Sequence, residues 1–161
     1  MKVAVVMGSK SDKDVVTKAV DILEKYGVEV DWRIISAHRT PVLAHEFASS
    51  LEGNYEVCIA CAGKAAHLAG VIAGITTIPV IGLPIKSSTM DGLDSLLSVV
   101  QMPSGVPVAT VAINGAENAG ILALQILGIK YPEIATKLKE LKSEMNDKII
   151  ADDNTLKSER G

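Results

Sequence analysis

His38 and Arg39 stand side by side in a short polar stretch, residues 36–41, and their side chains are well suited to chemistry. An apolar segment, 32–35, leads into the stretch like the end of a strand, and the Thr-Pro pair that closes it is typical of an N-cap and first turn of a helix. In open α/β sheets, ligands bind at such strand-to-helix turns. Imidazole moves protons near neutral pH, and guanidinium is a forked donor for phosphate or carboxylate. An ordinary turn can hold the same residues, so spacing alone leaves both interpretations open.

A second polar loop, residues 8–12, follows the apolar run 3–7. A glycine at its start lets the backbone approach a ligand, and the hydroxyls of Ser9 and Ser11 beside a helix start can cradle phosphate or ribose. Asp12 can instead simply cap the helix. The loop matches neither the G-x-G-x-x-G pattern nor the Walker A pattern, which argues against dinucleotide and nucleoside triphosphate binding.

A third loop begins at Gly63 and carries His67. A lone histidine among small residues is more often structural, but His38 and His67 both follow strand ends and are therefore expected at the same edge of the sheet. His45 falls within the helix after His38 and is expected at the surface. The three histidines lack metal-ligand spacing, and the chain has no G-x-S-x-G nucleophile motif.

These loops require a sheet that brings them together. Short apolar runs alternate five times with segments of helical periodicity, which predicts an α/β fold with a parallel sheet and right-handed crossovers. The best match is a flavodoxin-like three-layer sandwich with a central five-stranded parallel sheet, formed by one domain spanning residues 1–161. The expected strands are 3–7, 28–35, 57–62, 78–83 and 106–113, and the longer expected helices include 41–51 and 116–127.

Residues 132–150 predict an extra C-terminal helix, since the sheet already has its helices. Its narrow apolar stripe favours packing on another subunit, and the alternative is packing on its own domain. Residues 152–161 are polar and are expected to fray.

Composition excludes several classes of protein. The chain has 161 residues, 48% of them hydrophobic and 3% aromatic, with a formal net charge of −3, so a basic nucleic-acid surface is not expected. No apolar run reaches the length of a membrane span, and the N-terminus lacks a signal-peptide pattern. Cys58 and Cys61 lie three apart in an apolar strand and should point to opposite faces as buried thiols, which fits a reducing cytoplasm.

Taken together, the motifs resemble one known family, the class I N5-carboxyaminoimidazole ribonucleotide mutases of de novo purine synthesis. The resemblance covers nearly the whole chain except its tail. It rests on MGSKSD at 7–12, SAHRTP at 36–41, AAHL at 65–68, DSLLSVVQMP at 94–103 and VPVATVAI at 106–113.

The resemblance implies a flavodoxin-like subunit in a homo-octamer, without metal or organic cofactor, acting on a ribonucleotide. It implies transfer of a carboxylate from the exocyclic nitrogen of an aminoimidazole ribonucleotide to ring carbon 4. His38 matches the catalytic histidine, which protonates the carbamate nitrogen and later takes the proton from the ring carbon. The matching substrate-binding positions are Ser9, Asp12 and Arg39, and further residues lining the site match Ser11, Ser36, Gly63, His67 and Leu68.

Two positions depart from the family pattern. Lys64 and Ala69 stand where the family usually has Gly and Pro. Lys64 either lies in ordinary backbone with its ammonium in water, or lies at the rim of the pocket and attracts substrate by long-range charge. Arg39 favours the mutases over the related direct carboxylases, which commonly have Lys there. The alternatives are therefore direct carboxylation of aminoimidazole ribonucleotide with carbon dioxide, or a non-catalytic domain that binds nucleotide or flavin.

Overall fold

Five parallel strands form the centre of the computed structural model, which describes residues 1–88 and 90–159. Their order across the sheet is β2-β1-β3-β4-β5, the order of a flavodoxin-like doubly wound sheet, as predicted. Their bounds are β1 Lys2–Met7, β2 Glu29–Ile34, β3 Val57–Gly63, β4 Val80–Ile85 and β5 Ala109–Thr110.

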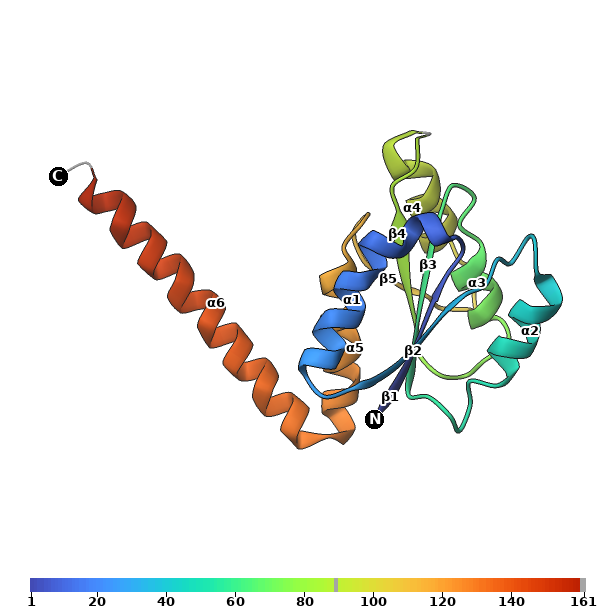
Figure 1. Cartoon of the computed structure of the whole chain (residues 1–161), viewed down its shortest axis with the longest axis horizontal. Coiled ribbons are helices and arrows are strands. Elements are labelled where there is room, and N and C mark those ends of the chain that lie inside the picture. Colours follow the sequence, from blue (N-terminus) through green and yellow to red (C-terminus); the bar gives the residue numbers. More distant parts are fainter. Residues whose placement is uncertain (89, 160–161) are drawn as a thin grey trace.

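Helices cover both faces of this sheet (Figure 1). One face carries α1 (Lys13–Lys25), α5 (Ala116–Lys130) and the start of α6 (Pro132–Ser158). The other face carries α2 (Pro41–Ser49), α3 (Leu68–Ala73) and α4 (Leu93–Val100). Two short 3₁₀ helices, η1 (Lys10–Asp12) and η2 (Met90–Gly92), precede α1 and α4.

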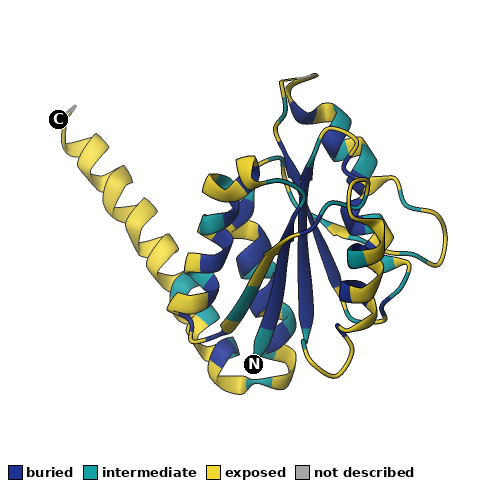
Figure 2. Ribbon diagram, turned by 45° about the vertical axis from the view of Figure 1, so that its right-hand side comes forward, coloured by how far each residue is buried: buried dark blue, intermediate teal, exposed yellow. Residues whose placement is uncertain are grey.

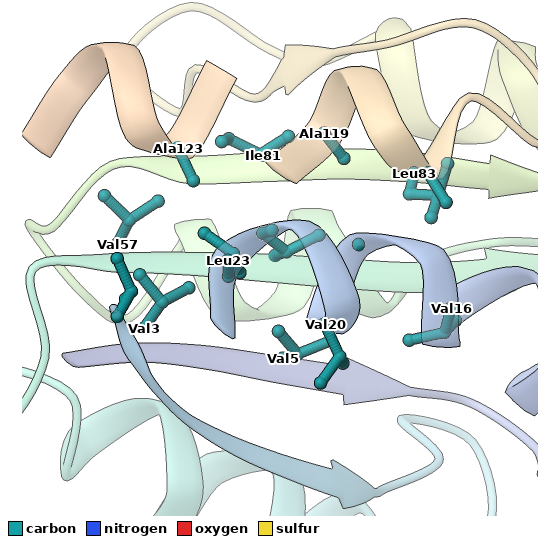
Figure 3. Close-up of a cluster of buried hydrophobic side chains, with 14 of the residues drawn as sticks. Val3, Val5, Val16, Val20, Leu23, Val57, Ile81, Leu83, Ala119 and Ala123 are labelled. Carbon is teal, nitrogen blue, oxygen red and sulfur yellow. The ribbon is translucent and has the colours of Figure 1, made fainter. Parts of the chain in front are cut away.

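Aliphatic side chains build the core, as the low aromatic content requires. Strands β1, β3 and β4 are buried along nearly their whole length, as Figure 2 shows. Figure 3 shows side chains of these strands packed against α1 and α5. Burying a Val, Leu or Ile side chain contributes about 1.5–3 kcal/mol, so this layer supplies much of the driving force for folding. It includes Val3, Val5, Val57, Ile81 and Leu83 of the strands, and Val16, Val20, Leu23, Ala119 and Ala123 of the helices.

The two cysteines confirm the alternation expected of a strand. Cys58 packs in the layer beneath α2 and α3, whereas Cys61 packs in the layer beneath α1 and α5. Both are fully buried free thiols, and burial raises the pKa of Cys58 to about 12 and that of Cys61 well above its ordinary value. A thiol that stays protonated is a poor nucleophile, so neither cysteine is suited to redox chemistry.

The fifth strand is much shorter than the predicted 106–113. Ladder pairing covers only Ala109–Thr110, and Pro107, just before this pair, has no N–H to donate to a ladder. The chain still follows β4 beyond this point. Val111 N–H donates to Gly82 O at 3.1 Å, and Asn114 N–H donates to Pro84 O at 2.9 Å.

The C-terminal helices are longer than predicted. Helix α5 runs past Gly128 to Lys130, and Pro132 rather than the glycine ends it, since Tyr131 before the proline takes φ −115° and ψ 95°. The expected fraying of 152–161 is wrong for the residues up to Ser158, which continue α6; residues 160–161 lie outside the described residues. A Lys157–Asp153 pair supports the last turns.

Helix α6 leaves the body of the subunit. Ile134 is buried and Leu138 and Leu141 pack on the core, so the first turns rest on their own domain. Farther along, Met145 and Ile149 are exposed and the helix projects into solvent (Figures 1 and 2). Of the described helices, none has the length and apolar composition needed to cross a membrane.

Candidate active site at the carboxyl edge of the sheet

A cavity of about 550 Å³ lies where β1, β2, β3 and β4 end. Loops that follow these strands meet there because parallel strands present their carboxyl ends at one edge of the sheet. The cavity is lined by all the residues predicted for the site, namely Ser9, Ser11, Asp12, Ser36, His38, Arg39, Gly63, His67 and Leu68. Three segments of chain separated by up to about fifty residues therefore converge as the strand-end argument predicts.

The loop after β1 forms the floor on one side. Ser9 Oγ accepts from Ser11 N–H at 3.3 Å and lies 2.9 Å from Ser11 Oγ, which in turn lies 3.2 Å from Asp12 Oδ1. Asp12 is buried, and this burial raises the pKa of its carboxyl, while the Ser11 hydroxyl and the Arg39 charge act in the opposite direction. Asp12 makes no side-chain cap to α1, so helix capping does not account for its position.

The loop after β2 carries Arg39, whose side chain contacts the loop after β1. The Nε–H of Arg39 donates to Ser36 Oγ at 3.1 Å, and an Nη2–H donates to Gly8 O at 2.8 Å. These bonds engage two of the five guanidinium donors and fix the orientation of the fork. Thr40 is the N-cap of α2 and Pro41 is its first residue, as predicted, but the Thr40 side chain makes no cap bond. Its hydroxyl donates to Ser36 O at 2.9 Å and accepts from Ser36 N–H at 3.1 Å, which closes the turn.

The two histidines predicted at this edge are in contact. His38 Nε2 lies 2.9 Å from His67 Nδ1, and the rings meet edge to face with centroids 5.0 Å apart. Because a hydrogen bond needs one donor and one acceptor, one of these nitrogens carries the shared proton and the other is bare. His38 is exposed to the cavity and is thus placed to exchange a proton with a bound molecule. His45 is exposed on α2 and does not line the cavity, as predicted.

The loop after β3 contains a backbone feature that sequence analysis left open. Gly63 is the last residue of β3 to pair with β4, and a Cβ there would lie 3.2 Å from Ile85 O, so glycine permits this close approach. Lys64 follows at φ +57°, a left-handed conformation that is uncommon for a lysine. The interpretation of ordinary backbone at Lys64 is therefore wrong.

Sequence analysis missed the contribution of the loop after β4. The cavity is also lined by the last residue of β4, Ile85, and by Lys86, Ser87 and Ser88 of the loop that follows it. Lys86 Nζ pairs with Asp91 at 3.0 Å. The signal for this wall was available, since a polar segment follows the fourth apolar run in the chain just as the other site loops follow theirs.

This arrangement suits an anionic ligand that exchanges a proton. Arg39 and the serine hydroxyls provide donors near the N-termini of α1 and α2, where anions are stabilised. Within residues 1–88 and 90–159, no group of three or more His, Cys, Asp or Glu side chains could hold a metal ion.

Comparison with known proteins agrees with the kind of ligand site that the geometry indicates. The profile of a family described as AIR carboxylase matches residues 2–148. The chain belongs to the AIR carboxylase family. Members with curated names are highly similar to it. The N5-carboxyaminoimidazole ribonucleotide mutase of Pyrococcus horikoshii is 58% identical over 148 residues, which cover 91% of this chain and 84% of that protein. The protein of the same name from Thermotoga maritima is 57% identical over 150 residues, covering 92% and 88%.

Family members also share the fold. A crystal structure of Treponema denticola PurE aligns with a TM-score of 0.87 at 31% identity and covers 96% of this chain and 98% of that one. A longer plant member, the chloroplastic phosphoribosylaminoimidazole carboxylase of Vigna aconitifolia, is 47% identical over 152 residues, which are 94% of this chain but 27% of that protein.

Proposed function

We propose that this protein converts N5-carboxyaminoimidazole ribonucleotide to 4-carboxy-5-aminoimidazole ribonucleotide in purine biosynthesis. The observation that carries the proposal is the His38–His67 contact inside a cavity that also holds Arg39. It is supported by membership of the AIR carboxylase family and by relatives named as mutases.

His38 supplies the proton transfers. It protonates the exocyclic nitrogen as the carbamate N–C bond breaks, which releases carbon dioxide inside the cavity. Ring carbon 4 then attacks the carbon dioxide and a new C–C bond forms. The same His38 nitrogen that gave up its proton in the first step now takes the proton from that carbon. The proton donated in the first step is recovered in the last, so the reaction is an isomerisation with no net consumption of protons.

His67 orients His38 through the 2.9 Å contact between their ring nitrogens. A fixed imidazole loses less entropy when it reaches the transition state, which is the usual benefit of a positioning residue. Leu68 and the small side chains of the β3 loop line the same part of the cavity and exclude water from the released carbon dioxide.

The nucleotide phosphate lies beside Arg39, Ser9 and Ser11. Arg39 lines the cavity and is held by Ser36 and Gly8, and charge-assisted bonds to phosphate are stronger than neutral ones. The buried Asp12 carboxyl provides an acceptor for a hydroxyl or amine of the ligand.

The assembly proposed for this enzyme is a homo-octamer in the cytoplasm. Exposed apolar residues on the projecting part of α6, including Met145 and Ile149, favour contacts with other subunits. Two free, buried thiols fit a reducing compartment.

Direct carboxylation of aminoimidazole ribonucleotide by carbon dioxide is the second candidate, supported by the carboxylase name of the plant relative. One experiment separates the two. The protein is incubated with freshly prepared N5-carboxyaminoimidazole ribonucleotide without added bicarbonate, and separately with aminoimidazole ribonucleotide plus bicarbonate. The proposal expects rapid product formation in the first incubation. Product in the second incubation alone would identify a carboxylase, and product in neither would reject both.

A further inference from the structure

Cations line the cavity on both sides of the histidine pair. Arg39 comes from the loop after β2, Lys64 from the loop after β3 and Lys86 from the loop after β4. Arg39 is engaged by Gly8 and Ser36, and Lys86 is paired with Asp91 at 3.0 Å. Among the described residues, Lys64 forms neither an ion pair nor a side-chain hydrogen bond, so its ammonium is available to a ligand.

The sheet separates Lys64 from the phosphate side of the cavity. Strand β1 lies between β2 and β3, and two strand spacings amount to about 10 Å. The contact between His38 and His67 spans this gap above β1. A ligand whose phosphate lies beside Arg39 therefore presents its reacting end at the histidine pair, on the side where Lys64 stands.

Backbone geometry ties Lys64 to that reacting end. It directly follows Gly63, the last paired residue of β3, and precedes His67 by one tight turn. Ala66 N–H donates to Lys64 O at 2.9 Å, and His67 N–H donates to Ala65 O at 2.8 Å. These bonds hold Lys64 and His67 in a fixed relation at the edge of the cavity.

The turn imposes a positive φ on Lys64, and a lysine at this position costs conformational energy that a glycine would not. A glycine would adopt φ +57° without strain, whereas a residue with a side chain is strained there. The Lys64 side chain is exposed and packs in neither buried core cluster. Strained residues that persist at the wall of a cavity are commonly there for function.

We propose that Lys64 binds the carboxylate that the reaction moves, and so sets the preference of the site for carboxylated over uncarboxylated nucleotide. This assignment rests on the function proposed above. An ammonium suits the task because it is a compact charge on a flexible stem with three rotatable donors. It can follow a carboxylate from the exocyclic nitrogen to ring carbon 4, whereas the planar fork of an arginine is matched to one fixed geometry.

The test compares binding of two stable nucleotides that differ by one carboxylate. The dissociation constants of 4-carboxy-5-aminoimidazole ribonucleotide and of 5-aminoimidazole ribonucleotide are measured by titration calorimetry for the full-length protein and for Lys64→Met. The variant is expected to bind the carboxylated nucleotide about tenfold or more weakly, with less than about a threefold change for the uncarboxylated one. Lys18→Met, which removes an exposed charge from α1 outside the cavity, is the matched control and should change neither constant.

Lys64→Gly separates charge from backbone strain. If the carboxylate contact is the cause, Lys64→Gly and Lys64→Met lose the same selectivity. A loss in Lys64→Gly alone would show a conformational effect and overturn the assignment. An equal weakening of both nucleotides that fades with salt would overturn it in favour of long-range attraction, and unchanged selectivity in both variants would overturn it outright. If the wild-type protein binds neither nucleotide, the proposed function fails and the assignment with it.

Discussion

Replacing Arg39 by leucine should separate ligand binding from folding. In the free protein the guanidinium donates to Ser36 Oγ at 3.1 Å and to Gly8 O at 2.8 Å, and the side chain is solvent-exposed. Exposed hydrogen bonds of this kind contribute little to the free energy of unfolding, so that free energy should fall by about 1 kcal/mol or less in the variant. A charge-assisted contact to the substrate phosphate is expected to be worth about 1.5–3 kcal/mol, which corresponds to a roughly 10- to 150-fold higher Kd.

The assay is titration calorimetry with 4-carboxy-5-aminoimidazole ribonucleotide, together with thermal unfolding of the free protein. Arg33→Leu is the matched control, because Arg33 lies exposed on the edge strand β2, outside the cavity, and carries the same charge. Arg39→Lys should recover only part of the affinity, since it keeps the charge without the fork. Equal Kd values for Arg39→Leu and Arg33→Leu would refute the placement of the phosphate beside Arg39.

Three further outcomes are expected. His38→Asn should bind nucleotide normally but should turn substrate over about 100-fold or more slowly. The control, His45→Asn on α2, should keep the wild-type rate. Near-normal turnover of His38→Asn in a stopped assay would remove His38 from the mechanism. Burial raises the pKa of Asp12, so the native state holds the carboxyl proton more tightly than the unfolded state does. The contribution of this group to stability is therefore present at low pH and falls as the pH rises from the ordinary pKa of 3.8 through the raised pKa. Asp12→Asn should melt at a higher temperature than wild type at pH 7 but not below pH about 3, whereas exposed Asp14→Asn should show no such difference, and identical melting curves for Asp12→Asn and wild type at both pH values would contradict this. Wild-type protein should sediment as a multimer at micromolar concentration and Ile149→Glu, on the projecting part of α6, as a smaller species; a monomeric wild type would rule out the proposed octamer.

The identity of the strands and the side of the sheet that carries the site follow from local sequence. Continuous apolar runs such as 3–7 and 57–62 are buried on both faces, and that pattern is visible without any structure. The alternation of Cys58 and Cys61 between two core layers follows from the period of a strand. The convergence of the polar loops needed only one further rule, that parallel strands end at one edge of the sheet.

Element ends depended on tertiary partners. Gly128 has the chemistry of a helix stop, but α5 continues past it to Lys130, and the break comes before Pro132, where α6 turns back onto the core. The predicted strand 106–113 has the right composition, yet only Ala109–Thr110 pairs with β4, whereas the other edge strand, β2, pairs along its whole length. The helix or strand propensity of a segment does not determine where the element ends.

The contacts within the site were also decided by tertiary structure. His38 and His67 lie 29 positions apart, and only the sheet order that puts β1 between their strands brings their ring nitrogens to 2.9 Å. The left-handed backbone of Lys64 is set by the close pairing of Gly63 with Ile85 and by the tight turns that follow it. Residue types therefore indicated which chemistry the site can perform, whereas its distances and backbone conformations are set by packing between segments far apart in the sequence.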